Sequence, residues 1–465
     1  MPMKYTKYIF ILTISITLQS CFVAKKYQRP DDVMTDRQYR NAMMSGDSGH
    51  ISRVPWREIF SDSLLIQYIS RGLANNLDVR IALTNIEAAQ AYVKQGQAAY
   101  YPTFNLGGSY ALSSPSLNSQ NLSERIYANQ FELSGDLAWE ADIWGKIRSN
   151  EKAVRATYMQ TVAAQQAIKS RLVASIASNY YQLLALDQQK RIAEETIENR
   201  RKSIETIQAL KMAGSVTEVA IKQNEAQWLN ARALLVDINN NIHLLENAFC
   251  ILLGDTPHDI SRTLLEAQKA DTLLSAGVPI QLLTDRPDVL AAEYGLINAF
   301  ELTNVARSNF YPSLRITAGG GFQSIDFDKF LSPGSLFATL VGSIAQPIFN
   351  GRKIRTQLEV SKARQEAALL DYKATIIQAS REVSDALNTY ASAGDKISLK
   401  RQEYQSYQQA INYSEELLNF GLANYLEVLT ARENMLNAQL SLVNTQYSRL
   451  NSMVQLYRAI GGGWQ

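Results

Sequence analysis

The segment IIQASREVSDALNTYASAGDKISLKRQEYQSYQQAINYSEELL, residues 376–418, carries an apolar or aromatic side chain at every seventh position. These positions are Ile376, Val383, Tyr390, Ile397, Tyr404, Ile411 and Leu418. An apolar repeat of seven sustained over this length indicates helices that supercoil against neighbouring helices. At 1.5 Å per residue, a helix over about residues 351–418 is roughly 100 Å long. One globular domain does not need a helix of that length.

Two further segments keep the same spacing. The apolar positions of the segment near the C-terminus are Leu422, Leu429, Leu436, Val443, Leu450 and Tyr457. Those of the segment in the first half are Ile221, Trp228, Leu235, Ile242 and Phe249. Proline, which breaks helix interiors, is absent between residues 115 and 257 and after 347. We therefore expect a second long helix over about residues 146–210. Gly214 and Gly421 follow the two long segments, and glycine suits a helix C-terminus. Each long helix should turn back there into an antiparallel partner.

Short stretches of alternating polarity lie between the helical segments. The apolar positions are Phe131, Leu133, Leu137 and Trp139 in one stretch and Leu314, Ile316, Ala318 and Phe322 in another. Residues 103–112 and 335–346 have similar length and period. Strands of about ten residues with one apolar face are typical of membrane β-barrels. Four strands cannot close a barrel, and lipid does not tolerate an open edge, so several copies of the chain must complete the cylinder. Two soluble hairpins on a helical body are the alternative.

The chain is also an internal duplication. Tyr101-Pro102 and Tyr311-Pro312 precede strand-like stretches in the two halves, and the two prolines are 210 positions apart. Each half runs helix, strand, strand, long helix, turn, helix, and chance would not preserve both order and spacing. We divide the chain into a signal peptide (1–20), a lipidated N-terminal segment (21–75), a first repeat (76–253), an equatorial connector (254–286), a second repeat (287–460) and a C-terminal tail (461–465).

The first 21 residues indicate export. Lys4 and Lys7 precede a short apolar run that is typical of a secretory signal peptide. The sequence Leu18-Gln19-Ser20-Cys21 then resembles the lipobox of bacterial lipoproteins, whose cysteine is diacylated. We expect a covalent lipid on Cys21; an ordinary signal cleaved near Ser20 is the alternative. The only other cysteine, Cys250, is then a small apolar residue in a helix.

Composition argues against several classes of protein. The formal net charge is only +2 and no long basic run occurs, so we expect no nucleic-acid partner. The three histidines are scattered, which predicts no metal site. Gly319-Gly320-Gly321 precedes no helix and so lacks the context of a dinucleotide loop. With no catalytic grouping in view, we expect neither an enzyme nor a cofactor beyond the lipid.

Several ordered motifs carry a family resemblance. They are Trp56-x-x-x-Phe60-Ser61-Asp62, Asn75-Asn76-Leu77-Asp78, Trp139-Glu140-x-Asp142-Ile143-Trp144-Gly145-Lys146, Arg286-Pro287-Asp288 and Pro347-Ile348-Phe349-x-Gly351. From about residue 50 to 460 the chain resembles the TolC-type outer-membrane efflux family, in its OprM- or NodT-like lipoprotein branch.

The resemblance implies a mainly α fold and a homotrimer. Each chain would give four strands to a shared twelve-stranded β-barrel, and the long helices would form an α-barrel that extends into the periplasm. The protein would be lipid-anchored in the outer membrane and would conduct small molecules passively. An inner-membrane efflux transporter would supply the energy, and a periplasmic adaptor would join the two.

The resemblance also implies a gate at the periplasmic tip, where acidic residues line the narrowest ring in related channels. Glu427 matches the first acidic position after Gly421, whereas Thr430 departs from the second. In the first repeat Ala220 departs from the corresponding position, although Glu218 is close. Three Glu427 carboxylates would form a ring that favours cations. A solvated helix residue is the alternative interpretation of Glu427.

Three alternatives to an efflux channel remain at this point. A duct for protein secretion would share the architecture. A structural coiled-coil lipoprotein would explain the helices and Cys21 but not the duplicated strands. A periplasmic adaptor would need lipoyl-like and β-barrel regions, which the sequence does not contain. No motif specifies the cargo.

Overall fold

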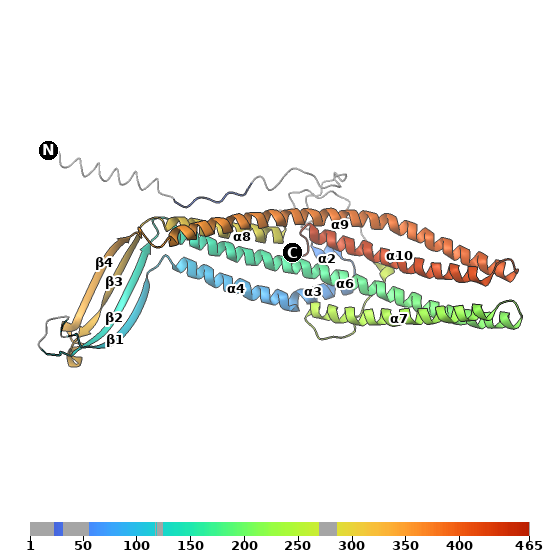
Figure 1. The fold of residues 1–465 in the computed structure, drawn as a ribbon, viewed down its shortest axis with the longest axis horizontal. Helices are drawn as coiled ribbons and strands as arrows, with labels where there is room; N and C mark the ends of the chain where they lie inside the picture. Colours follow the sequence, from blue (N-terminus) through green and yellow to red (C-terminus); the bar gives the residue numbers. More distant parts are fainter. Residues whose placement is uncertain (1–22, 31–54, 117, 119–123, 269–285, 465) are drawn as a thin grey trace. The chain divides into compact units, whose positions relative to one another are not determined.

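The structure is a computed structural model that describes residues 23–30, 55–116, 118, 124–268 and 286–464 (Figure 1). The signal peptide and Cys21 lie outside these residues. So do part of the equatorial connector and His50. The predictions made for them stay predictions.

Eight α-helices with assigned bounds account for most of the described chain. They are α2 (Trp56–Ile59), α3 (Ser63–Asn75), α4 (Leu77–Ala98), α6 (Lys146–Met212), α7 (Glu218–Leu253), α8 (Pro287–Ser308), α9 (Lys353–Asn419) and α10 (Tyr425–Ala459). The two long helices predicted over about residues 146–210 and 351–418 are confirmed as α6 and α9. Within the described residues, no helix is both long and apolar enough to cross a membrane.

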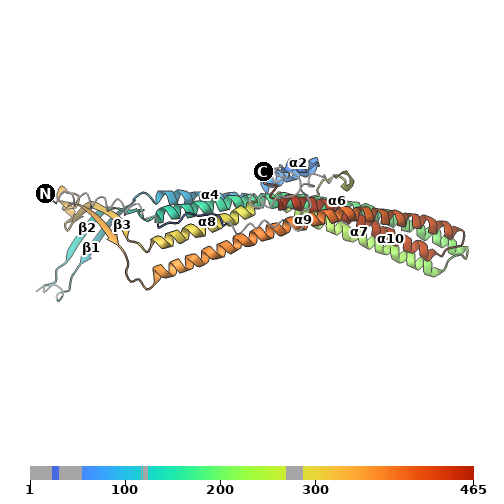
Figure 2. The same ribbon diagram turned by 90° about the horizontal axis from the view of Figure 1, so that it is seen from above.

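Each long helix is followed by an antiparallel partner. In both views α7 runs back along α6, and α10 runs back along α9 (Figures 1 and 2). The heptad positions Val383, Leu429 and Ile242 are buried, in keeping with packing between helices. Leu422 differs, because it lies in the turn before α10 and is 76% exposed. The heptad pattern therefore begins at Leu429 in this helix. Cys250 is fully buried in α7, as expected.

The four predicted strands form one antiparallel sheet in the order β1-β2-β3-β4. Their bounds are β1 (Thr103–Ser113), β2 (Ala128–Ala141), β3 (Ser313–Ser324) and β4 (Leu336–Ala345). Short 3-10 turns occur at Leu265–Ala267, and at Phe327–Lys329 and Pro333–Ser335 between β3 and β4. The β2–β3 pairing joins a hairpin from the first repeat to a hairpin from the second, in register from Phe131↔Ser324 to Ala141↔Leu314. The duplication is thus built into the sheet.

The chain divides into two compact units. Among the described residues, the first unit comprises 23–30, 86–161 and 292–372, and the second comprises 55–85, 162–268, 286–291 and 373–464. The sheet belongs to the first unit, and the turns after α6 and α9 belong to the second. Each unit is described by itself below.

In the first unit, residues 23–30 are held on α8. The Arg29 guanidinium forms a two-pronged ion pair with Glu293, with N···O distances of 2.6 and 2.7 Å. The Asn304 amide accepts a hydrogen bond from the Lys25 N–H at 3.2 Å and donates one to the Lys25 carbonyl at 3.0 Å. Because bidentate pairs fix both distance and orientation, this short segment has a defined place on α8.

In the second unit, the start of α4 is fastened to the end of α7. Asn76 caps α4 by accepting hydrogen bonds from the N–H groups of Asp78 and Val79, at 3.0 and 3.2 Å. Its amide also donates to the Leu252 carbonyl at 3.0 Å. Gly254 follows α7 with a φ of +75°, and a Cβ there would lie 2.6 Å from the Asn75 carbonyl oxygen. This contact joins the beginning of the first repeat to its end.

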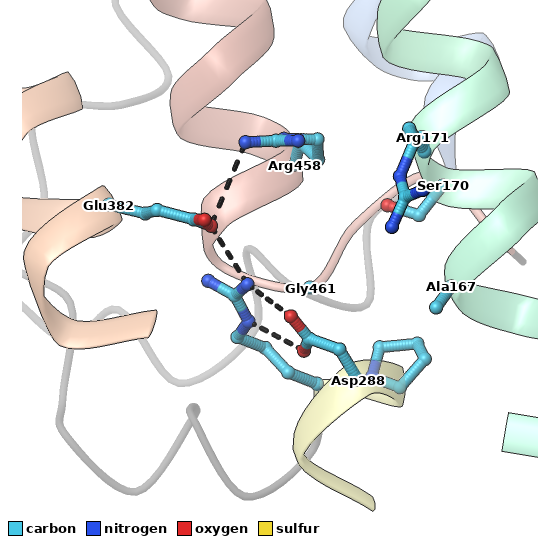
Figure 3. A pocket seen from close by; sticks show the side chains of 9 residues that line it. Ala167, Ser170, Arg171, Asp288, Glu382, Arg458 and Gly461 are labelled. Carbon is cyan, nitrogen blue, oxygen red and sulfur yellow. Dashed lines mark hydrogen bonds and ion pairs between the residues drawn. The ribbon is translucent and has the colours of Figure 1, made fainter. Parts of the chain in front are cut away.

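The second repeat is closed at the equivalent place by an arginine. Arg286 precedes α8, is only 5% exposed, and donates to the carbonyl of Ala459 at the end of α10, at 2.7 Å. Its guanidinium also pairs with Asp288 at 2.6 Å and with Glu382 of α9 at 2.9 Å. Asp288 and Glu382 lie at a small pocket of about 90 Å³, which Arg286 also lines, and the dashed lines in Figure 3 mark their ion pairs. The Arg-Pro-Asp motif thus ties three helices together.

The same ion pairs change how the two carboxyl groups titrate. Burial opposes ionisation of Asp288 and Glu382, but hydrogen bonds and charge from Arg286 outweigh it and hold the pKa of each below its ordinary value. A carboxyl with a lowered pKa in the folded state stabilises the fold above its unfolded pKa of about 4. That contribution is lost as the pH falls through the folded pKa.

We therefore predict that Arg286→Met lowers stability at pH 7 by about 3 kcal/mol, because it leaves two carboxylates without their buried partner. The difference from the wild type should shrink as the pH falls below about 4, where both carboxyl groups become protonated. Thermal unfolding followed by circular dichroism at several pH values measures this. Arg171→Met is the control, because Arg171 lines the same pocket but makes no ion pair among the described residues. A stability difference that does not vary with pH would contradict the prediction.

Candidate functional site: the sheet and the helical tips

One face of the sheet is apolar from edge to edge. Residues opposite each other in the register share a face, and this one carries Phe104, Leu106, Tyr110 and Leu112 of β1, Phe131, Leu133, Leu137 and Trp139 of β2, Leu314, Ile316, Ala318 and Phe322 of β3, and Leu336, Leu340 and Ile344 of β4. Leu106, Leu340 and Ile344 are 73%, 76% and 75% exposed. A continuous exposed apolar surface of this kind marks contact with a membrane or another protein.

Aromatic side chains stand at both ends of the apolar face. At the loop end, Phe131 lies 5.0 Å from Tyr110 and 5.3 Å from Phe327, measured between ring centroids. At the other end, the Trp139 indole donates to the Tyr100 carbonyl at 2.9 Å. Eight residues of strand separate Phe131 from Trp139, which is about 26 Å along the strand. With a tilt of about 40° this becomes roughly 20 Å along the membrane normal, close to the apolar band of about 25 Å in membrane barrels.

The opposite face of the sheet is polar and acidic. Glu132, Asp136 and Glu140 alternate with the apolar residues of β2, and Arg315 of β3 lies opposite Glu140. Glu140 accepts hydrogen bonds from Lys146 at 2.8 Å and Arg315 at 3.3 Å, whereas no cationic side chain lies beside Glu132 or Asp136 in the described register. This face therefore carries excess negative charge, as the wall of a cation pathway would.

Among the three glycines of β3, Gly321 has the strongest steric requirement. A Cβ on Gly321 would lie 1.9 Å from the Leu133 carbonyl oxygen, and one on Gly319 would lie 2.9 Å from a carboxylate oxygen of Asp136. A larger residue at Gly321 would push β2 and β3 apart, because its nearest neighbours are backbone atoms of β2, whereas the neighbour of Gly319 is the end of a side chain. The glycine run thus lies inside a strand.

The junction between β2 and α6 explains the tryptophan-rich motif of the first repeat. Asp142 accepts hydrogen bonds from the N–H groups of Ile147 and Arg148, at 2.8 and 3.0 Å, and so satisfies the free donors of the first helical turn. The Trp144 indole donates to the Pro312 carbonyl at 2.7 Å and stacks on Tyr311. The residues before β3 are thereby fixed to the start of α6.

Gly214 and Gly421 lie in the turns that follow α6 and α9. Both have positive φ, +77° and +68°, and a Cβ on either would meet nothing within 4 Å. Glycine is therefore favoured here by backbone conformation rather than by space. Ser215 and Leu422 donate from their N–H groups to the carbonyls of Leu210 and Leu417, each at 2.9 Å, which is the same helix-ending motif in both repeats.

The four predicted gate residues are placed as follows. Glu427 and Thr430 are exposed in the first two turns of α10, and the Thr430 hydroxyl donates back to the Leu426 carbonyl at 2.8 Å. Ala220 is half-buried. Glu218 is exposed at the start of α7 and forms an ion pair with Lys211 across the turn, which lowers its pKa. Within the described chain, no hydrogen bond or ion pair joins Glu427 to the other three.

The two helical hairpins contact each other through buried polar side chains. Tyr425, the first residue of α10, donates to Asn224 of α7 at 2.7 Å. Arg200 of α6 pairs with Glu433 of α10 at 2.7 Å, and the Arg432 guanidinium of α10 donates a hydrogen bond to the Ser203 hydroxyl of α6. A cavity of about 540 Å³ is lined in part by Arg200, Ser203, Tyr425 and Arg432. No local sequence pattern predicts these contacts, because the partners lie more than 200 positions apart.

A group able to hold a metal ion occurs at the end of the first repeat. His243, Glu246 and Asp259 each offer a ligand atom, and these atoms lie within 4.8 Å of one another. No metal site was expected from the sequence, because its three histidines are scattered. Folding brings one histidine beside two carboxylates that no short spacing motif connects.

A model of the outer membrane efflux protein family matches residues 68–255 and 278–462. The chain belongs to this family. The match falls in two segments because the chain contains two repeats. The predicted fold class, mainly α with four strands and an internal duplication, is confirmed.

Three relatives match across nearly the whole chain, and two of them are named as efflux proteins. The chain is similar to the cation efflux system protein CusC of Escherichia coli O6:H1, with 29% identity over 458 residues that cover 97% of this chain and 98% of that protein. It is 28% identical to the solvent efflux pump outer membrane protein SrpC of Pseudomonas putida, covering 97% of each. The probable outer membrane lipoprotein SilC of Salmonella typhimurium is 26% identical and covers 98% of this chain and 99% of that protein.

Solved structures agree. A crystal structure of CusC matches with a TM-score of 0.86 and 27% identity, covering 95% of this chain and all of that chain. The outer membrane protein VceC of Vibrio cholerae matches with a TM-score of 0.81 and 25% identity, covering 88% of this chain and 99% of that chain. The efflux-family chain is thus an outer-membrane channel protein, as predicted.

The sheet gives a direct test of membrane contact. Leu340→Arg places a charge at the middle of the apolar face, where it should cost about 2–4 kcal/mol in the bilayer. Thr339→Arg, one residue away on the polar face, should be tolerated. We expect the first variant to be depleted from the outer-membrane fraction and to melt at a lower temperature in detergent. Equal membrane levels and equal melting temperatures for the two variants would show that the apolar face does not contact lipid.

Proposed function

We propose that three copies of the chain form one channel that conducts small cations out across the outer membrane. The observation that carries the proposal is the sheet with two unpaired edges. Within the described chain, β1 pairs only with β2 and β4 only with β3. Unpaired backbone groups cannot face lipid. The edge of β4 on one copy must therefore pair with the edge of β1 on the next.

Strand direction and strand number support this assembly. Since the four strands alternate in direction, β4 of one copy is antiparallel to β1 of its neighbour without any rearrangement. Two copies would give a barrel of eight strands, whose interior side chains fill. Three copies would give twelve strands and leave an open lumen. The apolar face would then meet lipid and the acidic face would line the lumen.

The charge of the polar face supports cations as cargo. Each chain contributes Glu132, Asp136 and Glu140 against one arginine, Arg315. CusC is named as a cation efflux protein, which agrees with this charge. SrpC is named as a solvent efflux protein at nearly the same identity, so organic solvents are the second candidate cargo. A lumen wall with excess carboxylates favours the cations.

We further propose that the channel works as the passive outer part of a larger pump. The relatives are parts of efflux systems by name. From these names we infer that an inner-membrane efflux transporter supplies the energy. A periplasmic adaptor would contact the exposed helical tips around Gly214 and Gly421.

Glu427 is our candidate for the narrowest ring of the channel. It is exposed in the first turn of α10, next to a turn whose geometry is fixed by Gly421 and by Asn424, which accepts a hydrogen bond from the Leu426 N–H at 2.7 Å. In a trimer three Glu427 carboxylates would face one axis. Such a ring attracts cations and repels anions.

Single-channel recording in planar bilayers tests the channel and its cargo together. The purified protein should give discrete conductance steps and a reversal potential that shows preference for K⁺ over Cl⁻. Glu427→Gln should reduce that preference measurably. The control Glu416→Gln removes an exposed carboxylate from the last turn of α9 and should leave the preference unchanged. Anion preference in the wild type would refute cation cargo, and a protein without conductance would refute the channel.

The lipid on Cys21 is proposed from the lipobox and from the lipoprotein SilC among the relatives. Residues 23–30 are fastened to α8 in the same unit as the sheet. The acyl chains would therefore attach only two residues before a segment of fixed position.

We predict that Cys21→Ser abolishes incorporation of radioactive palmitate into the mature protein. Cys250→Ser is the control, since that thiol is buried and should not be acylated. Labelling that persists in the Cys21 variant would show that an ordinary signal peptidase processes the chain.

A further inference from the structure

Three metal-ligating side chains meet where the chain leaves α7. His243 and Glu246 are one helical turn apart on α7, and Asp259 lies in the segment that follows Gly254. One ligand atom from each lies within 4.8 Å of the other two. His243 and Asp259 are exposed, whereas Glu246 is only 5% exposed. The group is therefore open to solvent on one side and anchored on the other.

Glu246 is held with one oxygen free. Its Oε1 accepts hydrogen bonds from Arg262 at 2.5 Å and from the Ile260 N–H at 3.2 Å. Arg262 is itself held by two bonds to Asp187, at 2.5 and 2.8 Å. Oε2 is directed toward His243, whose Nδ1 lies 3.9 Å away. Neighbours that orient a ligating carboxylate in this way are typical of metal sites.

Asp259 is kept beside Glu246 by the residue that follows it. Ile260 is buried, with 4% of its surface exposed, and its N–H is the group bonded to Glu246. This bond fixes the backbone of the segment against α7, so the Asp259 carboxylate cannot move far from Glu246. The His243 and Asp259 side chains can still rotate, because both are exposed.

The charge around the group favours a cation. Asp187, Glu246 and Asp259 contribute three carboxylates, and Arg262 contributes one guanidinium. Two net negative charges therefore remain. An ion pair between His243 and Glu246 alone would leave the Asp259 carboxylate without a partner in the group.

We propose that His243, Glu246 and Asp259 bind one divalent metal ion of the borderline class, with Zn²⁺ the best fit. One imidazole and two carboxylates are ligands that Zn²⁺ accepts in sites with three protein ligands and a water. Soft monovalent ions such as Cu⁺ and Ag⁺ prefer thiolate and thioether ligands, and this site has neither. The site lies outside the sheet and the helical tips, so the proposal does not depend on the cargo of the channel.

The ion would fasten the segment after α7 to the helix. Tetrahedral ligands at about 2.1 Å from the metal are about 3.4 Å apart, so the exposed His243 and Asp259 need to move inward by only about 1 Å. Binding to the folded state alone raises stability in proportion to occupancy. Zn²⁺ should therefore raise the melting temperature of the protein.

Zn²⁺ titration of the full-length protein, without a histidine tag and freed of metal by chelator, tests the proposal. Isothermal titration calorimetry should give one ion per chain. His243→Ala and Asp259→Asn should each weaken Zn²⁺ binding by at least about tenfold. Replacing a residue that only supports a metal ligand already lowers metal affinity by about that factor. Zn²⁺ should raise the melting temperature of the wild type but not of these variants.

His258→Ala is the matched control. His258 is the neighbour of Asp259, but its Nδ1 lies 2.9 Å from the Thr256 carbonyl and 3.5 Å from the buried Cys250 sulfur. We expect this variant to bind Zn²⁺ like the wild type. The proposal is overturned if His243→Ala binds normally, if His258→Ala alone abolishes binding, or if Ag⁺ binds more tightly than Zn²⁺ at this site.

Discussion

The structure depends on one constraint, that every backbone hydrogen-bonding group of the sheet must be satisfied in lipid. Inside the sheet the three strand pairings satisfy the inner groups. The outer edges of β1 and β4 have no partner within the described chain. In water such edges would be solvated, but beside an apolar face as exposed as this one they must pair with another copy. Assembly is therefore a consequence of the sheet rather than an additional property.

In the helical part, the two ends of each repeat are held together by side-chain contacts. In each repeat the start of the first helix is fastened to the end of the last. Asn76 does this for α4 and α7, and Arg286 does it for α8 and α10. The first contact is a neutral hydrogen bond and the second is a buried ion network. The two repeats therefore share a geometry but differ in chemistry, which makes only the second sensitive to acid.

Much of this fold was predictable because its patterns are local. The heptads located α9, and the absence of proline located α6, each to within about two residues. The alternation in β2 and β3 located the sheet. Leu422 was misplaced because the spacing of seven continues by chance into a turn. Contacts such as Arg200 with Glu433 depend on how hairpins pack, and no spacing in the sequence encodes that.

The candidate sites were less predictable than the fold. The roles of Glu427 and Cys21 rest on motifs, and both remain predictions. The group of His243, Glu246 and Asp259 was not predicted from the sequence. Asp259 comes close to the other two only because the chain reverses after Gly254. The acidic face of β2 was visible in the sequence, but its meaning required the register that sets Glu140 against Arg315 and leaves Asp136 opposite a glycine.

The pairing of β1 with β4 between copies is the central claim, and disulfide cross-linking tests it most directly. Single cysteines placed along the outer edges of β1 and β4, in a chain whose Cys250 is replaced by serine, would be oxidised in native outer membranes. The account predicts that pairs with one cysteine on each edge give a covalent trimer, while chains with a cysteine on β1 alone give no cross-link. Cross-links between two β1 edges, or a native mass of one chain, would contradict the shared barrel.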